Sequence, residues 1–150
     1  MIKQYYGYDE CLKDCKELLP QLKAYNPDAI VAIARGGLTI GHLLSIGLNT
    51  NNLFTINSIH YDDTTKLDNF KITNIPNLKG FKKIILVDDI IDSGETIVEI
   101  KKILQKEYLY CEFKIVSIFY KKSALIQPDF TVKEAKNWIE FFWEKDIVVV

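Results

Sequence analysis

The segment that most constrains the fold of this chain is 84–96, which reads IILVDDIIDSGET. It opens with a short apolar run rich in β-branched residues, which predicts a strand buried on both faces. We expect this strand to end at the adjacent carboxylates Asp88 and Asp89. The cluster at 92–94 is typical of a tight turn, and apolar residues recur with helical spacing from Thr96 onward. The segment therefore predicts a strand, an acidic loop and a helix start in succession.

This succession predicts an anion site. The turn after a buried parallel strand lies at the carboxyl edge of the sheet, where open α/β folds bind their ligands. Free N–H groups at the helix start, with the hydroxyls of Ser93 and Thr96, suit a phosphate. The neighbouring carboxylates would repel a phosphate alone. A ligand that also carries sugar hydroxyls and a divalent cation removes the conflict, because carboxylates accept hydrogen bonds from a diol and hold the metal.

A second loop of this kind follows the apolar run 29–34, which predicts another buried strand. The run continues into Arg35, Gly36 and Gly37, and Arg35 is the single arginine in a chain with nineteen Lys and Arg residues. Glycines allow the backbone to approach a ligand closely, and a guanidinium binds anions through two parallel hydrogen bonds, which lysine does poorly. Taken alone, the loop could equally be an ordinary tight turn between a strand and a helix.

The segment from Val87 to Thr96 resembles the phosphoribosyl pyrophosphate (PRPP) signature of type I phosphoribosyltransferases. The resemblance implies that Asp88 and Asp89 bind the ribose hydroxyls and that Asp89 also holds Mg²⁺. It further implies that the 5′-phosphate and the pyrophosphate of PRPP are bound by two sets of residues: Asp92, Ser93, Gly94, Glu95 and Thr96 for the first, and Arg35, Gly36 and Gly37 for the second. Asp92 is also expected to be catalytic, taking the proton of the acceptor base.

The C-terminal segment 138–150 is rich in aromatic residues. It resembles the hood of bacterial xanthine–guanine phosphoribosyltransferases, which implies base binding by Lys121, Trp138 and Ile139. The sequence departs from that pattern at Phe142, where the prototype has a proline before the second tryptophan. The polar stretch at about 60–72 is long for a connection, and the same resemblance implies a mobile loop that closes over the site. His60 departs from the family there, since a serine usually precedes the loop tyrosine.

Alternating strands and helices predict an α/β fold with a mostly parallel central sheet flanked by helices, Rossmann-like in character. A helical stripe over about 8–25 is expected to be interrupted by Pro20 near its end. We expect one domain over 1–150, with a small C-terminal hood formed mainly by about 121–150.

Composition narrows the possible partners. The net charge is −1, so there is no global basic field to attract nucleic acid or an anionic membrane. No apolar segment approaches the length of a bilayer span, and the start of the chain lacks an apolar signal core, so we expect a cytoplasmic protein. The apolar end at 147–150 would be a liability if exposed, so we expect it to be buried in a sheet or against a partner. We also expect a homo-oligomer, either a dimer or a tetramer.

The function implied is that of a Mg²⁺-dependent pentosyltransferase. It would transfer the 5-phosphoribosyl group of PRPP to guanine, xanthine or hypoxanthine in purine salvage and release pyrophosphate. Two alternatives remain open at this point. One is a non-catalytic regulator that senses PRPP or a nucleotide, and the other is an aspartyl-phosphate hydrolase built on the pair Asp88 and Asp89.

Overall fold

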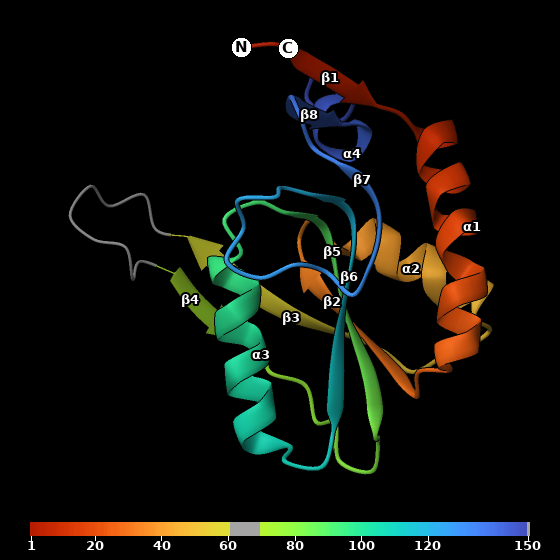
Figure 1. Ribbon diagram of the computed structural model, residues 1–150, viewed down its shortest axis with the longest axis vertical. Coiled ribbons are helices and arrows are strands. Elements are labelled where there is room, and N and C mark those ends of the chain that lie inside the picture. Colours follow the sequence, from red (N-terminus) through yellow and green to blue (C-terminus); the bar gives the residue numbers. More distant parts are fainter. Residues whose placement is uncertain (61–69, 150) are drawn as a thin grey trace.

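The computed structural model describes residues 1–60 and 70–149. The predicted α/β class is confirmed, since a mostly parallel sheet is flanked by helices on both faces (Figure 1). Within the described residues six strands form this sheet, in the order β4-β3-β2-β5-β6-β7. Their bounds are β2 Ala29–Ala34, β3 Leu53–His60, β4 Phe70–Thr73, β5 Lys83–Ile91, β6 Glu112–Tyr120 and β7 Phe130–Glu134. All neighbouring pairs are parallel except β3 with β4, which is antiparallel.

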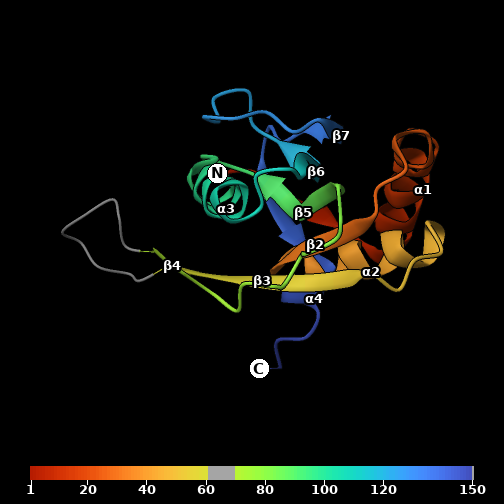
Figure 2. The ribbon, with the colours of Figure 1, turned by 90° about the horizontal axis from the view of Figure 1, so that it is seen from below.

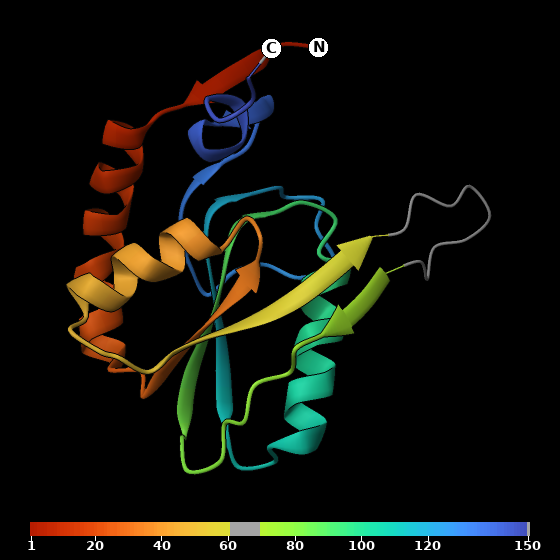
Figure 3. The same cartoon turned by 180° about the vertical axis from the view of Figure 1, so that it is seen from behind.

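The helices cover opposite faces of the sheet, as Figures 2 and 3 show. Helices α1 (Tyr8–Tyr25) and α2 (Leu38–Gly47) pack on one face, and α3 (Glu95–Glu107) packs on the other. β5 explains why both faces need cover. Its residues alternate between the two cores, with Ile85 and Val87 facing α1 and α2, and Ile84 and Leu86 facing α3. A strand of this kind reads as a continuous apolar run, as the sequence does.

The expected break at Pro20 is wrong, because α1 continues through Pro20 to Tyr25. No helix in the described ranges, 1–60 and 70–149, has the length and apolar character needed to cross a membrane.

The hood differs from the sequence prediction. It is a two-stranded parallel sheet of β1 (Lys3–Tyr6) and β8 (Trp138–Phe141), followed by the short helix α4 (Phe142–Lys145). Figure 1 shows these elements together at the top of the molecule. β7, which falls inside the range expected for the hood, belongs to the large sheet instead. The hood therefore takes one strand from each end of the chain, and the N-terminal strand was not predicted.

Two further boundaries differ. β5 does not end at Asp88 but continues to Ile91, because β6 is equally long and pairs with it up to Ile91 and Tyr120. The expected mobile loop at about 60–72 lies mostly outside the described residues, as does any contact of the His60 side chain. Its last residues belong to β4, which pairs with β3.

Candidate active site

A cavity of about 910 Å³ opens between the carboxyl ends of the parallel strands and the hood. All but two of the residues predicted for the site line this cavity: Arg35, Gly36, Asp88, Asp89, Asp92, Ser93, Gly94, Thr96, Lys121, Trp138 and Ile139. They come from the ends of β2, β5 and β6, from the start of α3 and from β8. Segments that are far apart in the sequence thus form one site.

The loop after β2 brings a cation to the cavity. The Arg35 side chain is exposed, and it makes no ion pair with any residue in the part of the chain described, so its guanidinium is available to a ligand. Gly36 lies directly against β5, because a Cβ atom at Gly36 would overlap the carboxylate of Asp89. The peptide between Ala34 and Arg35 is cis. Glycine at position 36 is therefore favoured by the close approach of this loop to the Asp89 side chain of β5.

The two adjacent acids at the end of β5 are strongly perturbed. Asp89 is 7% exposed, and burial raises its pKa to about 6, although hydrogen bonds from Asp88 and from the Ile90 N–H act in the opposite direction. Burial also raises the pKa of Asp88 well above its usual value, and the negative charge of Asp89 adds to the effect. Carboxylates held in this way gain from a cation or from hydroxyl donors brought by a ligand.

The loop between β5 and α3 is shaped by Gly94, which has φ +86°. Residues other than glycine rarely adopt this conformation. A Cβ atom at Gly94 would also come within 3.1 Å of the Leu125 nitrogen. The Ser93 carbonyl accepts a hydrogen bond from the Leu125 N–H at 2.8 Å. The Ser93 hydroxyl oxygen accepts one from the Glu95 N–H at 3.2 Å. The start of α3 is therefore fixed at the cavity wall, where its N-terminal dipole favours an anion.

Lys121 and Asp92 form an ion pair at the cavity, with Nζ and Oδ1 2.7 Å apart. Their side chains are 38% and 62% exposed, so the pair contributes little to stability. Trp138 of the hood is 56% exposed for a large aromatic residue, and Ile139 follows it on the cavity wall. This end of the cavity offers a cation, a carboxylate and an aromatic face.

Two of the predicted residues do not line the cavity. Gly37 precedes α2, and a Cβ atom there would overlap the carbonyl oxygen of Val87. Its requirement for glycine is thus explained by packing against β5. Glu95 is the first residue of α3, and its backbone N–H is already bonded to Ser93.

Several residues of the cavity wall were not predicted from the sequence. Ser58 of β3 lines the cavity, and its hydroxyl is buried without a hydrogen-bond partner among the described residues. Glu144 of α4 reaches the same cavity, and its negative charge contributes to the raised pKa of Asp89. Met1 and Ile2 also reach it. Glu144 could have been predicted, because an acid directly after Phe142 and Trp143 is unusual for a core segment. Nothing in the local sequence indicated Met1, Ile2 or Ser58.

The carboxylates at the cavity are the candidate ligands of a metal ion. Within residues 1–60 and 70–149, no group of three or more His, Cys, Asp or Glu side chains is arranged to hold one. The cavity does carry the adjacent carboxylates of Asp88 and Asp89, and one or two carboxylates together with oxygens of a bound phosphate and water are the usual ligands of Mg²⁺ in proteins.

Comparison with known proteins identifies the family. The chain matches the phosphoribosyl transferase domain over residues 1–147, and it therefore belongs to the phosphoribosyltransferase family. The resemblance seen at 87–96 is confirmed by this match.

Particular relatives agree with the family assignment. A xanthine-guanine phosphoribosyltransferase of Idiomarina loihiensis is 28% identical over 147 residues, which is 93% of this chain and 86% of that protein. Among solved structures, the xanthine-guanine-hypoxanthine phosphoribosyltransferase of Helicobacter pylori is 39% identical with a TM-score of 0.91, covering 97% of this chain and 96% of the other. A purine phosphoribosyltransferase of Pyrococcus horikoshii is 29% identical with a TM-score of 0.84, covering 100% and 99%.

Proposed function

We propose that this protein transfers the 5-phosphoribosyl group of PRPP to a ring nitrogen of a 6-oxopurine and releases pyrophosphate. One observation carries the proposal: both strand-end loops and the wall of Lys121, Trp138 and Ile139 face a single cavity. At about 910 Å³ the cavity is of the size that holds small-molecule ligands. The relatives named above, which act on purines by their descriptions, support the choice of acceptor.

The PRPP end of the cavity would bind by charge and backbone donors. The start of α3 and the Ser93–Thr96 loop would take the 5′-phosphate, while Arg35 and the Gly36 amide would take the pyrophosphate. As the bond to pyrophosphate breaks, negative charge grows on the leaving group and positive charge grows on the anomeric carbon. Arg35 would stabilise the first of these charges. The carboxylates of Asp88 and Asp89, which would hold the ribose hydroxyls, would also stabilise the second.

Magnesium fits the same carboxylates. Asp89 would hold the ion with Asp88 beside it. The bound ion would neutralise part of the charge on the pyrophosphate.

The base end of the cavity would orient the acceptor. Trp138 offers an aromatic face on which a purine can stack, and the Ile139 carbonyl can accept a hydrogen bond from an exocyclic amine. In the free protein Lys121 is paired with Asp92. We infer that the Lys121 ammonium donates to the 6-oxo group of the base and that Asp92 accepts the proton of the attacking ring nitrogen. The ion pair keeps both groups at the place where the acceptor is needed.

The apolar segment after α4 supports a homo-oligomer. Ile147, Val148 and Val149 are 74%, 67% and 93% exposed. A second copy of the chain that covers this apolar end would remove it from water. Sedimentation velocity tests this: a single species at the monomer mass across the accessible concentrations would contradict it.

The test of function is a panel of acceptors with PRPP and Mg²⁺, read out as the mass of the nucleotide product. Guanine, xanthine and hypoxanthine are the candidate acceptors, with adenine and orotate as controls that lack the 6-oxopurine pattern. We expect a nucleoside 5′-monophosphate and pyrophosphate from at least one of the candidates and none from the controls. PRPP binding without turnover of any base would instead assign the regulatory alternative, and no binding of PRPP would refute both.

A further inference from the structure

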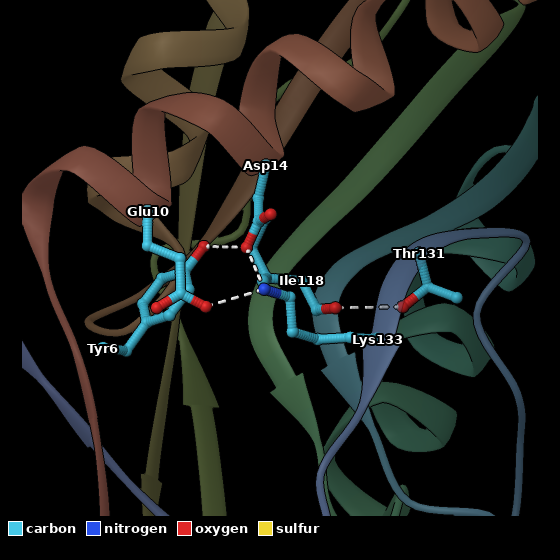
Figure 4. Close-up of polar contacts among 6 residues, drawn as sticks. All are labelled: Tyr6, Glu10, Asp14, Ile118, Thr131 and Lys133. Atoms are coloured by element: carbon cyan, nitrogen blue, oxygen red, sulfur yellow. Dashed lines mark hydrogen bonds and ion pairs between the residues drawn. The ribbon is translucent and has the colours of Figure 1, made fainter.

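A partly buried polar cluster lies away from the cavity, between α1 and the start of the hood (Figure 4). At its centre is the Asp14 carboxylate, whose side chain is 4% exposed. Its Oδ2 atom accepts a hydrogen bond from the Tyr6 hydroxyl at 2.7 Å and lies 2.9 Å from Lys133 Nζ. Lys133 also donates to Glu10 Oε2 at 2.7 Å. We define Tyr6, Glu10, Asp14 and Lys133 as the hinge cluster.

The hinge cluster is costly for the fold unless it serves a geometric purpose. Burial lowers the pKa of Lys133, but the hydrogen bonds to Glu10 and Asp14 outweigh it, so the net shift is upward and the charged pair persists. Only the Asp14 end of the pair is buried, since the side chains of Lys133 and Glu10 are 30% and 38% exposed, and a buried carboxylate held in this way is weak evidence of a gain in stability. What the ion pair adds is direction, because each partner accepts only a narrow range of positions.

The two partners of Asp14 connect to opposite ends of the segment 135–141, which contains the predicted base-binding residues Trp138 and Ile139. We call this segment the base wall. Lys133 is in β7, immediately before the stretch 135–139 that lines the cavity. Tyr6 is in β1 and pairs in register with Phe141 at the end of β8. One carboxylate oxygen on α1 therefore holds the base wall from both sides.

The hinge cluster also contacts the strand that carries Lys121. The Tyr6 ring packs edge-to-face on Phe119 of β6 and on Phe141 of β8, with centroids 5.1 Å and 5.8 Å away. Lys133 Nζ lies 5.8 Å from the centre of the Phe119 ring. In addition, the Thr131 hydroxyl donates to the Ile118 carbonyl at 3.2 Å, which ties β7 to β6 (Figure 4). The distance between Lys121 and the hood is thus set through the same contacts.

We propose that Asp14 is a positioning residue that fixes Trp138 and Ile139 relative to Lys121 and so determines the affinity for the acceptor base. This inference rests on the proposed function of the cavity. The Asp14 carboxylate does not line the cavity, and its effect on the base is exerted through Tyr6 and Lys133. The PRPP loops at Arg35 and at 92–96 lie on β2 and on the start of α3, outside the hinge cluster, so binding of PRPP is expected to be independent of it.

The experiment compares D14N, Y6F and K133M with the wild type in steady-state assays. We expect D14N and K133M to raise the KM for the base about tenfold, which corresponds to the loss of about one hydrogen bond, with the KM for PRPP changed less than about twofold. Y6F keeps the ring and removes one donor, so it should fold and should raise the KM for the base by a smaller factor. Because Tyr6 acts through Asp14, the double variant D14N/Y6F should have the same KM for the base as D14N alone.

Lys114→Met is the matched control. Lys114 is also a strand lysine between two acids, lying 3.7 Å from Glu112 and 3.9 Å from Asp129. Neither of these ion-pair partners belongs to the hood as the structure describes it. We expect its KM for the base to stay at the wild-type value. Equal rises in both KM values in D14N, or a lower melting temperature with no change in the KM for the base, would show that the hinge cluster only supports the fold and would overturn the proposal.

A second measurement separates this proposal from the proposed function. Both tryptophans of the chain, Trp138 and Trp143, belong to the hood, so acrylamide quenching of intrinsic fluorescence reports on the hood directly. We expect D14N to be quenched more strongly than the wild type and K114M to be quenched equally. If the wild type turns over no base, the proposed function fails while the quenching still tests the positioning role. Unchanged quenching in D14N would refute that role even in an active enzyme.

Discussion

The substitution D89N should make the protein more stable and at the same time less able to bind PRPP. Asp89 is 7% exposed and its pKa is raised from 3.8 to about 6. The folded protein therefore holds a proton on Asp89 up to about pH 6, whereas the unfolded chain releases it near 3.8. Stability falls as the pH rises through this window, because the unfolded state binds fewer protons than the folded state. The difference between the two pKa values corresponds to about 3 kcal/mol above pH 6.

Asparagine removes this cost without changing the shape of the side chain. Its carbonyl oxygen can still accept the hydrogen bond that the Ile90 N–H donates to Asp89 at 2.7 Å, and it adds no atom against Gly36. For a chain of this length, about 3 kcal/mol raises the melting temperature by about 6–12 °C. We expect this rise at pH 7.5 and no rise at pH 4, measured by calorimetry.

The matched control is D92N, which removes a carboxylate from the same cavity. The Asp92 side chain is 62% exposed and pairs with Lys121, so its loss should change stability by less than about 1 kcal/mol. A melting temperature for D89N that is equal to or below that of the wild type at pH 7.5 would refute the electrostatic reasoning. So would a rise of equal size at pH 4.

Three further substitutions test individual contacts. G36A places a Cβ atom on the Asp89 carboxylate, so PRPP affinity measured by calorimetric titration should fall about tenfold or more, and unchanged affinity would show that the loop yields freely. S58A removes a buried hydroxyl that lines the cavity and has no partner among the described residues, so the melting temperature should stay the same or rise. If this hydroxyl bonds to PRPP, the affinity for PRPP should fall, and an unaltered affinity would show that Ser58 does not bind it. D92N should lower turnover in a steady-state assay far more than it weakens PRPP binding, and full turnover would exclude Asp92 as the base.

Two strand-end loops of the cavity wall could be predicted from the sequence because the chemistry of each is contiguous. Asp88, Asp89 and Ser93 lie within six positions of one another on one strand and the turn that follows it, so local pattern and the carboxyl-edge rule predicted that they lie together, while the resemblance to the PRPP signature supplied their expected roles. Arg35 was a candidate because a lone guanidinium beside two glycines is chemically distinctive, and it lines the same cavity.

The hood could not be predicted in the same way. Its sheet pairs Tyr6 with Phe141, and such a pairing across the whole chain leaves no mark in the local sequence. Four residues of β1 followed by Gly7 gave too short a pattern to identify a strand. The extension of β5 to Ile91 was missed because adjacent acids usually end a buried strand, whereas here they lie at its ligand-facing end. Ser58 and the hinge cluster are visible only once partners from distant segments are placed together.

In the proposed mechanism one PRPP molecule spans both strand-end loops. The most direct test is a calorimetric titration of the wild type with PRPP and Mg²⁺ in competition with pyrophosphate and, separately, with ribose 5-phosphate. We predict one PRPP per chain and competition by both fragments, with R35M losing competition by pyrophosphate while it keeps competition by ribose 5-phosphate. Binding of either fragment at the same time as PRPP, without effect on its affinity, would contradict the account.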